Sequence, residues 1–132
     1  MLKGNFFRIL QITESNSETE TSSLNSSYRV TISLNPDHPI YQGHFPGNPI
    51  VPGVCQLRMI TEIISEITGK EVRLQEADNM KFLSMINPNE HPELTVDCTL
   101  KELKENEDGF IRVTASISDN EHIFFKYKSL VA

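Results

Sequence analysis

The chain is poor in basic residues. Its 12 Lys and Arg stand against 18 Asp and Glu, so the 132 residues carry a formal net charge of −6 at pH 7. Proteins that bind nucleic acids use a positive surface to neutralise phosphates, and anionic lipids attract clusters of Lys and Arg. The charge balance therefore argues against a nucleic-acid partner and gives no reason to expect binding to a membrane surface.

Cysteines and long hydrophobic runs are also scarce. Cys55 and Cys98 are too few for a disulfide framework or a zinc site, and their apolar neighbours predict reduced, buried thiols. No segment approaches the roughly 18 apolar residues of a membrane span. Arg8 and Gln11 interrupt the apolar N-terminal stretch, which is not typical of a signal peptide. We expect a cytoplasmic protein without a membrane segment.

The residues that are present fit one folded domain over residues 1–132. A hydrophobic content of 38% at this length is enough for a core without metals or disulfides. Apolar residues at helical spacing predict a helix over residues 54–68, with Gly69 as its C-terminal cap. On another stripe of this helix, Cys55, Arg58, Glu62 and Glu66 predict a solvated face. Alternating or extended patterns predict strands near residues 5–12, 28–34, 71–86 (with a kink near 77–78), 94–100, 111–117 and 123–127.

Residues 36–53 differ in composition from the rest of the chain. They hold five of the seven prolines and three of the six glycines. Proline fixes φ and removes a backbone donor, so we expect a stiff loop without regular helix or strand. The apolar residues within the loop indicate that it packs against the domain, and rigid loops of this kind often carry functional sites.

The residues 43–54, GHFPGNPIVPGV, form a specific motif within this loop. The motif resembles the signature G-H-F-P-G-x-P-x-x-P-G-V of the 3-hydroxyacyl-[acyl-carrier-protein] dehydratases, which have the hot-dog fold. Residues 78–83 are also similar to the strand that lines the acyl channel in that family. The resemblance implies an α+β hot-dog fold, in which an antiparallel sheet wraps around one long central helix. It also implies a dimer whose sheets join edge to edge.

The resemblance further implies a reaction and the residues that carry it. The reaction is the reversible loss of water from a 3-hydroxyacyl thioester held on phosphopantetheine, without a metal or other cofactor. His44 is expected to take the C2 proton, and the Gly53 N–H to polarise the thioester carbonyl at the helix N-terminus. We expect Phe45, Val54 and Phe82 to bind the acyl chain. Phe82, Leu83 and Met85 are predicted to be core residues, and a further role in lining the acyl tunnel stays open because tunnel and core share walls in this fold.

One position departs from the family pattern. The dehydratases have Glu or Asp fourteen residues after the histidine, and here that position is Arg58. The carboxylic acid protonates the leaving hydroxyl, which a guanidinium does not do because its pKa exceeds about 12. Arg58 remains able to hydrogen-bond the hydroxyl or bind an anion. Glu62, one turn further along the helix, is expected either to reach the site as an acid or to pair with Arg58.

Several functional alternatives remain open. The chain is expected to be a weak dehydratase by itself, or to form a heterodimer with a related subunit that supplies the acid. It is alternatively a non-catalytic acyl-binding or partner subunit, or, less favoured, a hot-dog thioesterase.

The expected carrier is the acidic acyl carrier protein, or else coenzyme A, and Arg73, Lys81, Lys126 and Lys128 are candidates for docking a carrier protein. Homodimers, heterodimers and higher oligomers all fit the sequence, and His38, His91 and His122 are expected at the surface.

Overall fold

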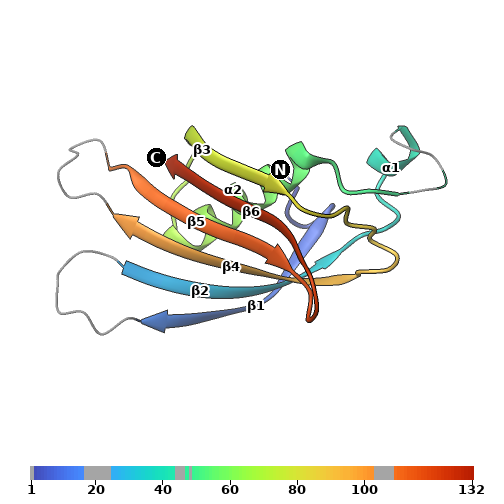
Figure 1. Ribbon diagram of the computed structural model, residues 1–132, viewed down its shortest axis with the longest axis horizontal. Helices are drawn as coiled ribbons and strands as arrows, with labels where there is room; N and C mark the ends of the chain where they lie inside the picture. The colour runs from blue at the N-terminus through green and yellow to red at the C-terminus, as the bar shows by residue number, and fades with distance from the viewer. Residues whose placement is uncertain (1, 17–24, 44–46, 48, 103–108) are drawn as a thin grey trace.

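The computed structural model describes residues 2–16, 25–43, 47, 49–102 and 109–132. Six antiparallel strands form one sheet in the order β1-β2-β4-β5-β6-β3, and helix α2 lies across one face of it (Figure 1). The elements are β1 (Phe7–Asn16), β2 (Asn25–Leu34), α1 (Ile40–Gly43), α2 (Gly53–Thr68), β3 (Leu74–Phe82), β4 (Glu93–Glu102), β5 (Ile111–Ser118) and β6 (Ile123–Val131). This arrangement confirms the predicted α+β fold with a sheet around one long helix.

Helix α2 forms because its apolar residues recur at helical spacing and pack together against the sheet. Met59, Ile60, Ile63 and Ile64 are each 0% exposed. The helix ends at Gly69, which takes the left-handed conformation with φ 74° and donates its N–H to the Ser65 carbonyl at 3.0 Å. Glycine adopts this conformation without steric cost. The predicted helix and its cap are therefore confirmed.

The sheet buries one side of each central strand against α2. Residues of β5 alternate between buried and exposed along most of its length, and β4, β5 and β6 are neighbours in sequence and in the sheet. This is the meander predicted from three alternating runs. Both cysteines are buried and unpaired, and burial raises the pKa of the Cys98 thiol to about 12. No helix among the described residues is long and apolar enough to cross a membrane.

Strand β3 differs from its neighbours because it lies at the edge of the sheet and all nine of its residues are exposed. Register shifts interrupt its pairing with β6 between Leu74 and Glu76 and between Ala77 and Asn79. The second shift confirms the kink predicted near residues 77–78. The strand is exposed along its whole length although apolar side chains recur along it, and its last residue, Phe82, lies against Gly53 of α2.

Three expectations from the sequence need correction. Residues 36–53 are not wholly irregular, because residues 40–43 form one helical turn. Pro39 lies just before that turn, where a missing N–H removes no helical bond. The first strand runs over Phe7–Asn16, where residues 5–12 were expected. Phe82, Leu83 and Met85 are not core residues of this chain, since they are 51%, 53% and 72% exposed. Sequence pattern alone marks them as apolar without saying which chain covers them.

Candidate functional site

The start of helix α2 presents backbone donors at the end of the proline-rich loop. Cys55 N–H and Gln56 N–H both donate to the Pro52 carbonyl, at 3.0 and 3.1 Å. Gly53 and Val54 come earlier in the first turn, where an α-helix has no internal acceptor for its N–H groups. The positive end of the helix dipole lies at the same place. This turn can therefore bind an oxygen that carries developing negative charge.

Gly53 is required at this turn because an aromatic ring covers it. A Cβ atom at residue 53 would lie only 2.9 Å from Cζ of Phe82, at the end of β3. The Phe82 ring also stacks on Phe125, with centroids 4.5 Å apart and an angle of 19° between the planes. The ring thus packs between the first turn of α2 and strand β6. Phe82, expected to contact the acyl chain, lies beside the backbone donors.

Gly53→Ala should lower the free energy of unfolding by about 1–3 kcal/mol, because the added methyl group forces the Phe82 ring to move. Gly43→Ala is the matched control, since a Cβ there meets no atom of the described residues within 4 Å. Urea denaturation of both variants, of Phe82→Leu and of the Gly53→Ala/Phe82→Leu pair measures the coupling. Equal costs of Gly53→Ala with and without Phe82 would show that this contact is not the cause.

An open groove of about 990 Å³ runs along α2 from this turn. Val54 and Leu57 lie at one end of its helix wall, and the chain from Gly69 to Leu74 forms the opposite side. Val54 is 71% exposed, so its side chain is available to a ligand or to another chain. The groove begins at Val54 in the first turn and has a partly apolar surface, which suits an extended, mostly apolar ligand.

Arg58 reaches the groove, and Glu62 lies one turn further along the same helix. The Arg58 side chain is 63% exposed, and its Nε is 3.5 Å from Oε2 of Glu62, whose side chain is only 14% exposed. The sequence left open whether Glu62 pairs with Arg58 or reaches the site, and the structure shows the pairing.

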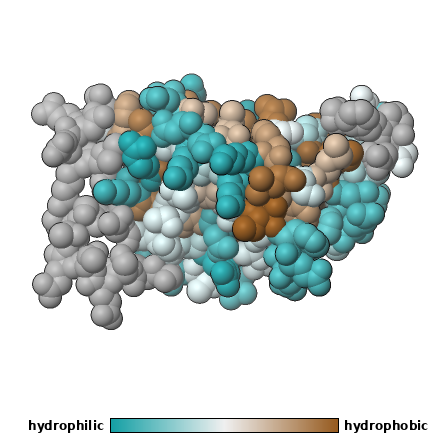
Figure 2. All heavy atoms as spheres, in the orientation of Figure 1, coloured by the Kyte–Doolittle hydropathy of each residue, from teal (hydrophilic) through white to brown (hydrophobic). Residues whose placement is uncertain are grey.

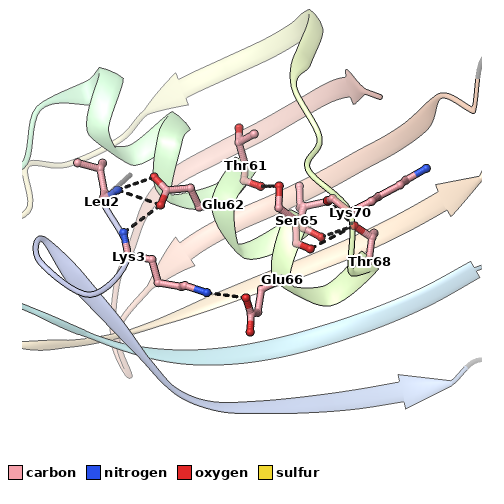
Figure 3. Close-up of polar contacts among 9 residues, drawn as sticks. Leu2, Lys3, Thr61, Glu62, Ser65, Glu66, Thr68 and Lys70 are labelled. Carbon is pink, nitrogen blue, oxygen red and sulfur yellow. Dashed lines mark hydrogen bonds and ion pairs between the residues drawn. The ribbon is translucent and has the colours of Figure 1, made fainter.

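Glu62 also holds the N-terminal segment against the helix. Its Oε1 accepts the N–H groups of Leu2 and Lys3 at 2.9 Å each, and its Oε2 accepts the Leu2 N–H at 3.0 Å (Figure 3). The Lys3 ammonium in turn pairs with Glu66. Hydrogen bonds from N–H donors to a carboxylate are charge-assisted and stronger than bonds between neutral groups. Glu62 therefore serves this chain as an acceptor, and both of its oxygens are engaged.

The helix stripe predicted to be solvated is only partly so. Cys55, in the first turn of the helix, is only 5% exposed, and Glu62 is bound by N–H groups of the N-terminal segment. Arg58 and Glu66 are exposed, as expected. His44 and Phe45, the expected base and one expected acyl contact, lie outside the described residues.

Two buried polar residues near the motif were missed from the sequence. Gln56 is 3% exposed; its Nε2 donates to the Val51 carbonyl at 3.3 Å, and its Oε1 has no partner in the described part of the chain. Tyr41, three residues before His44, is 6% exposed. Its hydroxyl also lacks a partner there, and burial raises its pKa. A signal for Gln56 was present in the sequence. This residue precedes Ile60 by four residues and Ile63 by seven, a spacing that places all three on the same buried helix face.

Two of the other histidines are less exposed than predicted. His38 accepts the Ile40 N–H at Nδ1 and packs edge-on against Phe6. The side chain of His91 is 25% exposed, and its Nδ1 is 3.2 Å from Asp119. His122 is exposed, as expected. Across the described ranges, no group of three or more His, Cys, Asp or Glu side chains is arranged to hold a metal ion.

The sheet, the long helix and their order define a hot-dog fold, which two solved structures share. One is an uncharacterized protein from Erwinia carotovora subsp. atroseptica, with a TM-score of 0.59 and 18% identity over 93% of this chain and 91% of that one. The other is the dehydratase heterocomplex ApeI:P from Xenorhabdus doucetiae, with a TM-score of 0.56 and 15% identity over 93% and 99%. The predicted fold is thus confirmed.

The family follows from the sequence comparisons. The model of the ApeI-like family, described as ApeI dehydratase, matches residues 17–126. The chain therefore belongs to the ApeI-like dehydratase family. It is 34% identical over 73 residues to the 3-hydroxyacyl-[acyl-carrier-protein] dehydratase FabZ of Oenococcus oeni, covering 50% of this chain and 51% of that protein. For FabZ of Pediococcus pentosaceus the identity is 31% over 88 residues, covering 61% and 57%. The chain spans about half the length of the curated relatives it matches, and the resemblance seen in residues 43–54 is confirmed.

Proposed function

We propose that this chain is the histidine-bearing subunit of a 3-hydroxyacyl-thioester dehydratase, a hydro-lyase that acts on acyl chains carried by phosphopantetheine. In this reaction the C2 proton and the C3 hydroxyl leave as water, and a double bond forms between C2 and C3. The single observation that supports this function best is the groove along α2, which begins at Val54 in the first turn of the helix, next to Gly53. No cofactor beyond the carrier of the substrate is required.

The first turn of α2 suits the charge that develops in the reaction. As C2 loses its proton, negative charge moves to the thioester oxygen. An N–H donor at a helix N-terminus stabilises that oxygen more than it stabilises the neutral carbonyl. We assign this role to Gly53, with Val54 and Phe82 in contact with the acyl chain. The base is His44, because a neutral imidazole accepts a proton near pH 7.

The acid that protonates the leaving hydroxyl is the missing element. Arg58 does not release a proton at working pH, and Glu62 already accepts two backbone N–H groups and pairs with Arg58. The acid is therefore expected to come from another chain. The heterocomplex named for the Xenorhabdus doucetiae structure supports a related hot-dog subunit as its source.

The edge strand β3 supplies the surface for such a subunit. Its residues Leu74, Ala77, Met80 and Phe82 lie opposite buried residues of β6 and so belong to the helix side of the sheet. Leu74, Met80 and Phe82 are nonetheless 40–51% exposed. Figure 2 shows, as a separate feature, hydrophobic groups set among hydrophilic ones on the face of the molecule seen in Figure 1. A second subunit that extends the sheet at β3 covers this apolar row and satisfies the unpaired edge.

The other face of the same edge is suited to an acidic carrier. Lys81 on β3 lies directly opposite Lys126 on β6, and Lys128 lies two residues further along the same face. All three side chains are exposed. Like charges directly opposite one another on neighbouring strands destabilise the pair, and an acidic protein surface relieves that repulsion. Acyl carrier protein is the partner we propose, with coenzyme A as the alternative carrier.

One observation favours a second candidate, a non-catalytic acyl-binding or partner subunit. No carboxylate of α2 is left for acid catalysis in the described structure, because Glu62 and Glu66 both pair with groups of their own chain. A protein of this kind binds the thioester in the groove without converting it. Thioester hydrolysis is less favoured, because the complete dehydratase loop is present in the sequence.

An assay of the hydration of a 2-enoyl thioester of acyl carrier protein distinguishes the dehydratase from the non-catalytic subunit and the thioesterase. We expect slow turnover by the purified chain, and a loss of at least about 100-fold in His44→Ala, because general-base catalysis contributes about 10²–10⁴. Adding a carboxylate-bearing related subunit should raise the wild-type rate. Thioester binding with no turnover above the His44→Ala background in either setting would favour the non-catalytic role, and release of free thiol would indicate a thioesterase.

A further inference from the structure

The groove along α2 carries more cations than carboxylates, which would oppose contact with the same groove of an identical chain. Among the described residues, four cationic side chains line the groove against three carboxylates, in a protein whose net charge is −6. Each of the carboxylates pairs within its own chain: Glu66 with Lys3, Glu62 with Arg58 and Glu71 with Arg73. The groove wall therefore has a local positive excess and no unengaged carboxylate among the residues that line it.

Among these cations, Arg58 would lose the most stabilisation if another subunit bound over the groove. Its guanidinium is 63% exposed, and its single described contact with a carboxylate is through Nε, at 3.5 Å. That carboxylate is shared with the Leu2 and Lys3 N–H groups. When a subunit covers the groove, Arg58 loses water, and an incompletely paired buried charge is costly. The planar fork of the guanidinium matches an incoming carboxylate in two parallel hydrogen bonds.

A second copy of this chain does not meet that need. A two-fold dimer uses the same patch on both subunits. Where the groove lies at the axis of such a dimer, the positive excess of one copy faces that of the other. We propose that Arg58 acts as a partner selector, which disfavours a homodimer at this groove and favours a related hot-dog subunit with a carboxylate opposite Arg58. The inference rests on the proposed function for the class of partner.

Sedimentation analysis of neutral variants tests this role. Arg58→Met keeps the length of the side chain and removes its charge, so we expect self-association at least tenfold tighter than in the wild type. Arg29→Met is the matched control, because Arg29 is exposed to a similar degree and pairs with Asp97, on β2 and β4 away from the edge strand. Unchanged or weaker self-association of Arg58→Met, or an equal gain in Arg29→Met, would overturn the proposal.

Mixing the wild type with Arg58→Glu gives a second measurement. The mixed pair brings a carboxylate toward Arg58, so differently labelled chains should form mixed dimers well beyond the random 1:2:1 distribution, and added salt should reduce this excess. A random distribution would contradict partner selection. Because neither measurement uses substrate, an inactive protein leaves both informative, whereas an active protein that shows neither effect refutes only the selector role.

Discussion

Arg58→Glu should raise the rate at which the purified chain hydrates a 2-enoyl thioester by about 10²–10⁴, which is the usual contribution of general-acid catalysis. Hydration and dehydration share one transition state, so the acid that protonates the leaving hydroxyl also assists water addition in the reverse direction. The new carboxyl group lies fourteen residues after His44, where the dehydratases carry theirs. The rate is measured at protein concentrations at which the variant is a dimer.

Within the described ranges, the neighbourhood of residue 58 offers no other acid on the same helix face. Glu62 lies one turn away, but its carboxylate accepts the Leu2 and Lys3 N–H groups. Arg58→Gln is the matched control, since it removes the charge without adding an acid. A rate gain in Arg58→Gln equal to that in Arg58→Glu would show that removal of the cation, and not acid catalysis, is responsible.

The sequence predicts the elements that depend on local pattern. Helix α2 was expected over residues 54–68 and is found at Gly53–Thr68, because its apolar spacing and its glycine cap act within one segment. The kink near residues 77–78 coincides with a register shift of β3. The single helical turn at Ile40–Gly43 was missed, because a proline-rich composition indicates rigidity without specifying where the backbone turns.

Contacts between distant segments could not be predicted in the same way. The sequence offers Glu62 two roles, and only the fold places the N–H groups of Leu2 and Lys3 on its carboxylate. Phe82 was expected to be a buried residue, but in this chain it covers Gly53 and remains half exposed. The sequence pattern of an apolar side chain at a sheet edge is the same whether its own chain or another chain buries it, so the pattern predicts a core residue in both cases.

A mixture of two chains that each lack one catalytic group should be far more active than either chain alone. The wild type has His44 but no acid at residue 58, whereas the double variant His44→Ala/Arg58→Glu has the acid but no base. If the site is shared across a dimer, the mixed dimer alone contains one complete pair, His44 from one chain and Glu from the other. Mixing equal amounts should therefore raise turnover by about 10²–10⁴ over either chain alone.

The measurement that tests the central claim most directly is turnover as a function of the mixing ratio at constant total protein. A site built from two chains predicts a rate that rises from both pure proteins to a maximum near equal amounts. A rate that varies linearly between the two pure proteins would contradict it, because each chain would then be contributing whatever activity it has without the other.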